Sequence, residues 1–317
     1  MIVCISANPA LDRRLRVENF VPGDVNRARS TEILPGGKAA HVAMAARALG
    51  EETVWVAFLG GPIGEQCAQE LRALDVEVVP VRTHAPTRIN LEIIDNAGSI
   101  TEILEPGGTP SHDELQQMVR LLEVQLAGKW KGTLVALSGS LPVGVPADFY
   151  SRLIEMAHAA GSKVFLDTSG DALKTGLTSG PDFVKPNRKE AEALLDRALN
   201  TPADAQNAVK ELMKRGARSA ALTLAAEGLV WSESLQGPTW CARPPQIRPV
   251  STVGSGDVTL AGFAYARQHG WHGEPAVRFA TACGVANCLA KLEGRINLQE
   301  VESLVPQIQV TRLSDAR

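Results

Sequence analysis

The residues that could most clearly carry chemistry form a short glycine-rich segment near the C-terminal end of the chain. Gly254 and Gly256 flank Ser255, and Asp257 begins a run of small and apolar residues that is typical of a buried helix. Unpaired N–H groups at a helix start favour an anion, most often phosphate. A carboxylate there would repel the anion, but it could take a proton from an attacking hydroxyl. An Asp that only caps the helix explains these four residues equally well.

A second candidate anion site precedes an alanine-rich segment near the N-terminus. Gly36 and Gly37 lead into a helical segment, 39–50, with Lys38 at its first turn and Gly50 as the residue that ends the helix. The earlier glycine of a P-loop is missing, so the segment is not a Walker A nucleotide site.

Composition and charge limit the class of protein. The chain has 317 residues, of which 44% are hydrophobic, so one large α/β domain over 1–317 can bury its core. A net charge of −3 argues against a dedicated nucleic-acid binder. The five cysteines lack CxxC spacing and are typical of reduced thiols. Neither a signal peptide nor an apolar run of about 18 residues is present, so we expect a cytoplasmic protein that does not bind membranes.

Short apolar strands and helices alternate along most of the chain. Strands are predicted at 1–6, 53–59, 76–81, 133–138, 163–167, 182–185 and 220–224, and helices at 64–74, 115–126, 147–160, 189–195, 203–215, 275–292 and 298–304. This order predicts a doubly wound, mostly parallel sheet with helices on both faces.

Two further segments, 13–34 and 87–104, alternate polar and apolar residues, as strands with one solvated face do. They fit poorly into a parallel sheet, so we expect them to form a small β-sheet lid over the site. One apolar face of that lid would need cover, which the lid of a second protomer could supply in a homodimer.

Polar residues follow several of the predicted parallel strands, at the edge where ligands bind in such sheets. They lie at 138–140, 167–170, 185–187, Thr223 and 254–257. Each group alone is explained by turn chemistry at a strand end. Together they predict one polar crevice that accepts phosphate.

The order of the motifs resembles the PfkB (ribokinase-like) sugar kinases, and within them the branch of 1-phosphofructokinase and tagatose-6-phosphate kinase. The motifs are Asn8-Pro-Ala-Leu-Asp12, Gly36-Gly-Lys38, Thr87-Arg-Ile-Asn90, Glu105-Pro-Gly107, Ser138-Gly-Ser-Leu-Pro142, Leu166-Asp-Thr-Ser-Gly170, Lys185-Pro-Asn187 with Glu190, and Gly254-Ser-Gly-Asp257, spread over about residues 1 to 305. The resemblance implies Mg²⁺- and ATP-dependent transfer of phosphate to a sugar hydroxyl, and a β-lid that often pairs protomers into dimers.

The resemblance also implies a role for each motif residue. Asp257 corresponds to the catalytic base, and Gly254, Ser255 and Gly256 to the anion hole. Contacts with the sugar phosphate correspond to Asp12, Gly37, Lys38, His41, Arg88, Asn90 and Ser138. Contacts with ATP correspond to Lys185, Asn187, Thr223, Gly228 and Asn287, and indirect placement of Mg²⁺, through water or phosphate, to Asn187 and Glu190.

Three positions depart from the family pattern. After Gly-Gly-Lys the family usually continues Gly-Ile-Asn, whereas Ala39, Ala40 and His41 follow here, so His41 replaces an Asn that commonly faces the sugar. Ala225 replaces a glycine of the nucleotide loop, and Ser255 replaces the more frequent Ala. The first departure leaves the ketohexose open, with fructose 1-phosphate ranked before tagatose 6-phosphate.

Two other functions stay open. A kinase of an unphosphorylated sugar or nucleoside would leave Lys38 and Arg88 without a partner, because neither has an acidic neighbour in sequence. We therefore expect both to hold a phosphate that the substrate already carries. The structural alternative pairs Arg88 with Glu92 or Glu102 and leaves Lys38 at a helix start. A non-catalytic sugar-phosphate sensor would have no need of Asp257.

Overall fold

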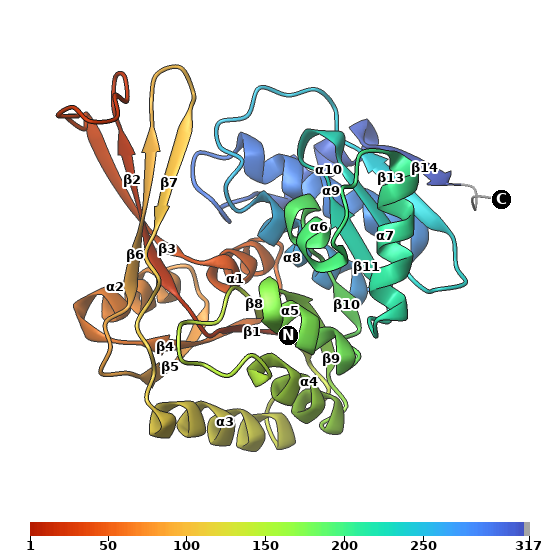
Figure 1. Ribbon diagram of the computed structural model, residues 1–317, viewed down its shortest axis with the longest axis horizontal. Helices are drawn as coiled ribbons and strands as arrows, with labels where there is room; N and C mark the ends of the chain where they lie inside the picture. The colour runs from red at the N-terminus through yellow and green to blue at the C-terminus, as the bar shows by residue number, and fades with distance from the viewer. Residues whose placement is uncertain (314–317) are drawn as a thin grey trace.

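A ten-stranded sheet forms the centre of the computed structural model, which describes residues 1–313 (Figure 1). Its strands, in order across the sheet, are β14 (Gln309–Leu313), β13 (Thr239–Arg243), β12 (Leu229–Ser232), β11 (Ala220–Thr223), β10 (Phe183–Val184), β9 (Lys163–Asp167), β8 (Leu134–Ser138), β1 (Ile2–Ser6), β4 (Thr53–Leu59) and β5 (Glu77–Arg82). Neighbours from β11 to β5 pair in parallel, and β12 to β14 add an antiparallel edge. The predicted doubly wound, mostly parallel sheet is confirmed.

Helices cover both faces of this sheet. They are α1 (Lys38–Ala48), α2 (Gly61–Arg72), α3 (His112–Ala127), α4 (Phe149–Ala159), α5 (Gly170–Thr178), α6 (Arg188–Leu195), α7 (Pro202–Lys214), α8 (Ser255–Gln268), α9 (Gly273–Leu289) and α10 (Leu298–Leu304), with short 3₁₀ turns η1 (Ala225–Glu227) and η2 (Val305–Gln307). Alternate residues of each strand enter two separate cores, so Cys4 packs with α1 and α8 while Val3 packs with α3 and α4. Among the described residues, no helix is long and apolar enough to cross a membrane.

Helix α5 and strands β12 and β14 are not predicted from the sequence. Helix α5 contains two glycines and two threonines, all poor helix formers. It forms because Leu173 and Leu177 are buried against the sheet. Gly176 allows this close approach, since a Cβ at that position would lie 2.7 Å from Leu166 Cδ2. Close packing on the sheet therefore outweighs the local preference.

The second sheet has four strands and extends away from the main body at the upper left of Figure 1. Its order is β3 (Ser30–Gly36), β2 (Ala10–Arg16), β6 (Arg88–Ile94) and β7 (Ile100–Leu104). The predicted small second sheet is confirmed, although its first strand β2 begins at Ala10 and residues 17–29 connect β2 to β3 without a strand. Parallel pairing of β2 with β6 sets Asp12 opposite Asn90.

Helix α3 begins with a capping box that can be tested by mutation. Ser111 N–H and His84 N–H donate to the two carboxylate oxygens of Glu114, over 2.6 and 2.7 Å. Burial by itself would raise the pKa of Glu114, but these donors and the His84 side chain outweigh it and lower the pKa to about 2.

We expect Glu114→Gln to lower the free energy of unfolding by about 1–3 kcal/mol at neutral pH, because hydrogen bonds to a charged group are lost. The folded-state pKa lies below the ordinary value of 4.5, so this stabilisation is present above pH 4.5 and is lost as pH falls toward 2. Urea unfolding at several pH values checks this, with exposed Glu123→Gln of α3 as the control. An unchanged gap between wild type and Glu114→Gln at low pH would contradict it.

Candidate active site

The glycine-rich segment forms the start of helix α8, as predicted. Gly254 is the N-cap and adopts the left-handed conformation, with φ 72°, which a residue with a side chain rarely takes. No side chain caps this end of the helix; Ser255 N–H donates to the Thr252 carbonyl over 3.3 Å, and the N–H groups of the residues that follow receive no side-chain cap. A Cβ on Gly256 would lie 3.2 Å from Lys185 Nζ. Bare backbone and a buried ammonium group therefore border the same space, which suits an anion.

Asp257 lies in the first turn of α8 and directs its carboxylate to another helix. Its Oδ2 is 2.9 Å from Nδ1 of His41, which belongs to α1. Asp257 is 6% exposed and His41 4%, so the contact is shielded from bulk solvent. The side chain is therefore part of an interhelical ion pair, and capping of its own helix does not account for it.

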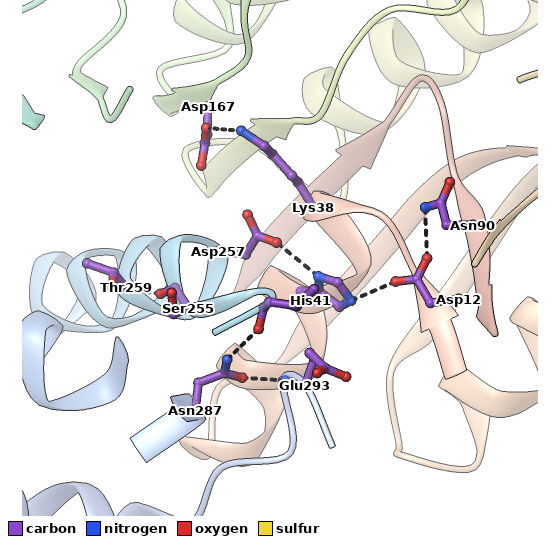
Figure 2. Close-up of polar contacts among 12 residues, drawn as sticks. Asp12, Lys38, His41, Asn90, Asp167, Ser255, Asp257, Thr259, Asn287 and Glu293 are labelled. Atoms are coloured by element: carbon purple, nitrogen blue, oxygen red, sulfur yellow. Dashed lines mark hydrogen bonds and ion pairs between the residues drawn. The ribbon is translucent and has the colours of Figure 1, made fainter. Parts of the chain in front are cut away.

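A chain of polar contacts runs from α8 to the second sheet (Figure 2). Nε2 of His41 lies 3.3 Å from Asp12 Oδ2, and Asn90 donates to Asp12 Oδ1 over 2.8 Å. Asp12 and Asn90 face each other because β2 and β6 pair in this register. Four of the predicted site residues are thus joined in one line: Asp257, His41, Asp12 and Asn90.

The second cluster joins the ends of two parallel strands to α1. Asp167, at the end of β9, forms ion pairs with Lys38 and Lys185, whose Nζ atoms lie 2.8 and 2.9 Å from its carboxylate oxygens. Lys38 also lies 3.1 Å from Glu190 Oε1. Burial would raise the pKa of Asp167, but Lys185 and Lys38 outweigh it and lower the pKa. The ends of β9 and β10 and the start of α1 therefore bring Lys38, Asp167 and Lys185 together in one charged cluster.

Lys38 has acidic partners in the folded chain, contrary to the expectation from its sequence neighbours. The premise that Lys38 lacks an acidic partner is wrong in space, because Asp167 and Glu190 already neutralise it and raise its pKa against the effect of burial. A phosphate would have to compete with two carboxylates for this ammonium group.

Arg88 is placed differently. Its guanidinium donates to two backbone carbonyls, those of Glu105 and Asn8, over 2.6 and 3.2 Å. Partial burial lowers the pKa of Arg88, although Asp12 and Glu105 oppose the shift. The alternative pairing with Glu92 is wrong, because Glu92 contacts Arg14 over 2.9 Å. Arg88 is thus a cation held in place by neutral groups.

Gly37 and Ser138, which the family resemblance assigns to the sugar, have structural surroundings of their own. Gly37 has φ 85° and caps α1, so it shapes the turn before Lys38. Ser138 is fully buried at the end of β8, and its Oγ has no hydrogen-bond partner within residues 1–313. Direct contact between Ser138 and a sugar would require the residues that cover Ser138 to move.

The residues assigned to the nucleotide gather at the ends of β10 and β11. Asn187 caps α6 and exchanges hydrogen bonds with Glu190, and it forms a β-bridge with Thr223. A Cβ on Gly228 would lie 2.0 Å from the Ala242 carbonyl oxygen, so glycine is required there by packing. Ala225 keeps a left-handed conformation, with φ 53°, where the resembling family has glycine.

Asn287 braces two loops. It is 1% exposed, donates to the Val253 carbonyl over 2.8 Å and accepts from Gly294 N–H over 2.8 Å. The segment before Gly254 and the segment after α9 are thereby held together (Figure 2).

The site residues suit Mg²⁺ only where water or phosphate lies between the side chains and the ion. No three His, Cys, Asp or Glu side chains in the described part of the chain cluster as direct ligands. Both oxygens of Glu190 already accept bonds, one from Asn187 N–H and one from Lys38. Mg²⁺ keeps several waters and binds through few carboxylates and substrate phosphates. Asn187 and Glu190 therefore suit a hydrated ion beside phosphate groups.

Sequence reasoning missed one buried network next to the site. Arg14 of β2 contacts both Glu92 of β6 and Glu293, which follows α9, and it also donates to the Lys291 carbonyl over 2.9 Å. Burial and the charge of Glu293 raise the pKa of Glu92 to about 7, against the pull of Arg14. Alternation placed Glu92 on a polar face, but no local signal identified Glu293, which is far away in sequence.

Comparison with known proteins gives consistent matches along the chain. The family described as pfkB family carbohydrate kinase matches residues 1–297. A 1-phosphofructokinase from Vibrio cholerae is 30% identical over 98% of this chain and 97% of its own length. A D-tagatose-1-phosphate kinase from Klebsiella oxytoca is 30% identical over 99% of this chain and 100% of its own length. The tetrameric inhibited form of phosphofructokinase-2 from Escherichia coli is 28% identical, with a TM-score of 0.87 over 96% of this chain and 98% of that chain.

Proposed function

Because the chain belongs to the pfkB family of carbohydrate kinases, which transfer phosphate to a hydroxyl group, we propose that it uses ATP to convert a ketohexose monophosphate to the bisphosphate. The observation that carries the proposal is the buried Asp257 carboxylate beside the uncapped start of α8. A base and an anion site are thereby adjacent. Fructose 1-phosphate ranks first and tagatose 6-phosphate second. The names of two relatives, which refer to 1-phosphorylated ketoses, support the first and add tagatose 1-phosphate.

In the proposed reaction, Asp257 orients the sugar hydroxyl and accepts its proton as the new P–O bond forms. The N–H groups around Gly256 and the ammonium group of Lys185 stabilise negative charge on the transferring phosphoryl group. Asn187 and Glu190 would hold hydrated Mg²⁺, which supplies neutralisation of the nucleotide phosphates. The chain thus contributes positioning, charge and one proton acceptor.

We further propose that the second sheet acts as a lid, since Asp12 and Asn90 on it lie in line with Asp257. Arg88 at the base of β6 would hold the phosphate that the substrate already carries. A kinase of an unphosphorylated sugar is the second candidate, and it is favoured by the fact that Asp167 and Glu190 already neutralise Lys38. The pairing of Lys38 with Asp167 and Glu190 leaves Arg88 as the stronger reason to expect a phosphorylated substrate.

The proposal is tested by identifying the product. Incubation with ATP, Mg²⁺ and fructose 1-phosphate should yield ADP and a sugar with two phosphate monoester signals by ³¹P NMR. Tagatose 1-phosphate, tagatose 6-phosphate and free fructose are compared in parallel. Release of inorganic phosphate without a bisphosphate would contradict the proposal, and binding without turnover would favour a sensor.

We expect a homodimer formed through the second sheet. Leu91 and Ile103 face each other across β6 and β7, and Ile103 is 51% exposed. An apolar sheet face of this kind needs cover. We expect light scattering to give twice the chain mass at micromolar concentration, and Ile103→Glu to shift it toward the monomer. Val124→Glu on α3, where Val124 is 68% exposed, is the control. A fully active wild-type monomer would contradict the proposal.

A further inference from the structure

His41 contacts two carboxylates that come from different parts of the fold. It lies on α1 and is almost fully buried. Nδ1 is 2.9 Å from Asp257 Oδ2 on α8, and Nε2 is 3.3 Å from Asp12 Oδ2 on β2 (Figure 2). The imidazole ring therefore stands between the proposed base and the second sheet.

This arrangement favours the imidazolium form. A neutral imidazole carries one N–H, so its other nitrogen would direct a lone pair at a carboxylate. Burial by itself would lower the pKa of His41, but Asp12 and Asp257 outweigh it and raise the pKa well above 6.5. As an imidazolium, His41 donates a hydrogen bond from Nδ1 to Asp257, and its positive charge also pairs with Asp12, which Nε2 approaches without forming a hydrogen bond.

The other charged groups near the ring, among residues 1–313, leave Asp12 and Asp257 without another cation in direct contact. Besides Asp12 and Asp257, carboxylates approach from the loop after α9 and from β7, while cations approach from β2 and α1; these groups are Glu293, Glu102, Arg14 and Lys38. Arg14 forms ion pairs with Glu92 and Glu293. Lys38 forms ion pairs with Asp167 and Glu190. The imidazolium is therefore the cation in direct contact with Asp12 and Asp257.

We propose that His41 is a positioning residue for the reaction: it holds Oδ2 of Asp257, turns Oδ1 toward the substrate hydroxyl, and ties this orientation to Asp12 on the second sheet. The inference rests on the proposed role of Asp257 as base. Two oxygens of one carboxylate then have separate tasks. Movement of β2 shifts Asp12, and the His41 ring passes this shift on to the Asp257 carboxylate. Closure of the second sheet is thereby coupled to the orientation of the base.

The direct test is the protonation state of His41 in the intact protein. With ¹⁵N-labelled histidine, both ring nitrogens of His41 should carry protons at pH 7.5, and Asp257→Asn should lower its pKa. A neutral His41 ring at pH 7.5 would overturn the inference and leave the function proposed above untouched. Wild-type turnover in Asp257→Asn would instead remove the base on which both depend.

A second test uses substitutions of His41. An amide cannot carry the positive charge that faces the two carboxylates, so His41→Asn should lower kcat by roughly 10²-fold, the cost typical of a misplaced catalytic group. The KM for ATP should stay near the wild-type value. The decline of kcat at alkaline pH that comes from loss of the His41 proton should disappear in the variant.

The control is His269→Asn, because His269 is a partly exposed residue just after the C-terminal end of α8, where it pairs with Glu51. It should keep the wild-type kcat and pH profile. An unaltered kcat and pH profile in His41→Asn would overturn the positioning role. If His41→Asn fails to fold, the protonation measurement on the wild-type protein decides the question alone.

Discussion

Asp257→Asn should lower kcat by roughly 10²–10⁴-fold while nucleotide and sugar still bind, the range expected when a general base is lost. The amide has nearly the shape of the carboxylate, so the start of α8 and the uncapped N–H groups should persist. It cannot accept the proton of the sugar hydroxyl. Steady-state kinetics with equilibrium binding of ATP and sugar phosphate separates the two effects.

The matched control is Asp171→Asn, which removes an exposed carboxylate from the first turn of α5. It should leave kcat unchanged. If Asp257→Asn keeps wild-type turnover, the carboxylate serves only the ion pair with His41 and the proposed mechanism is wrong. If binding of both substrates is lost together with turnover, Asp257 has a structural role instead.

Arg88→Ala should damage turnover of the phosphorylated substrate while barely changing that of the free sugar. Each charge-assisted hydrogen bond to phosphate contributes about 1.5–3 kcal/mol, so kcat/KM for the sugar phosphate should fall by about 10–150-fold. Arg88 suits this role because its donors are satisfied by the Glu105 and Asn8 carbonyls rather than by carboxylates. A panel of kcat/KM values for both sugars, in wild type and variant, measures the effect.

Arg82→Ala is the control, because Arg82 forms an exposed ion pair with Glu65 at the end of β5. It should leave both kcat/KM values unchanged. Arg88→Lys keeps the charge but loses the two-pronged geometry, so it should give an intermediate loss. Equal losses for free and phosphorylated sugar in Arg88→Ala would show that Arg88 only supports the turn around Glu105.

The main sheet could be predicted because its strands carry their own signal. Residues of β1 and β4 are buried on both faces, so they form short continuous apolar runs between polar turns. The second sheet could be predicted because Asn90 and Glu92 alternate with apolar residues on β6. Helix α5 could not, because its formation depends on contacts of Gly176 with Leu166.

The candidate site was predicted as a set of residue types, and its pairings were not. The sequence marked Lys38 as a cation near a crevice, but its partner Asp167 is 129 positions away. It marked His41 as a departure from a family pattern, but Asp257 is 216 positions away and enters from another helix. Ion pairs between distant strand ends are fixed by topology and register, which no local pattern contains.

The most direct test of the central claim is the ratio of kcat/KM for fructose 1-phosphate to that for free fructose, measured with ATP and the unaltered protein. A substrate phosphate held at Arg88 predicts a ratio of several orders of magnitude in favour of the phosphorylated sugar. Tagatose 1-phosphate and tagatose 6-phosphate in the same assay identify the preferred ketohexose. Comparable kcat/KM values for the free and phosphorylated sugars would contradict the account.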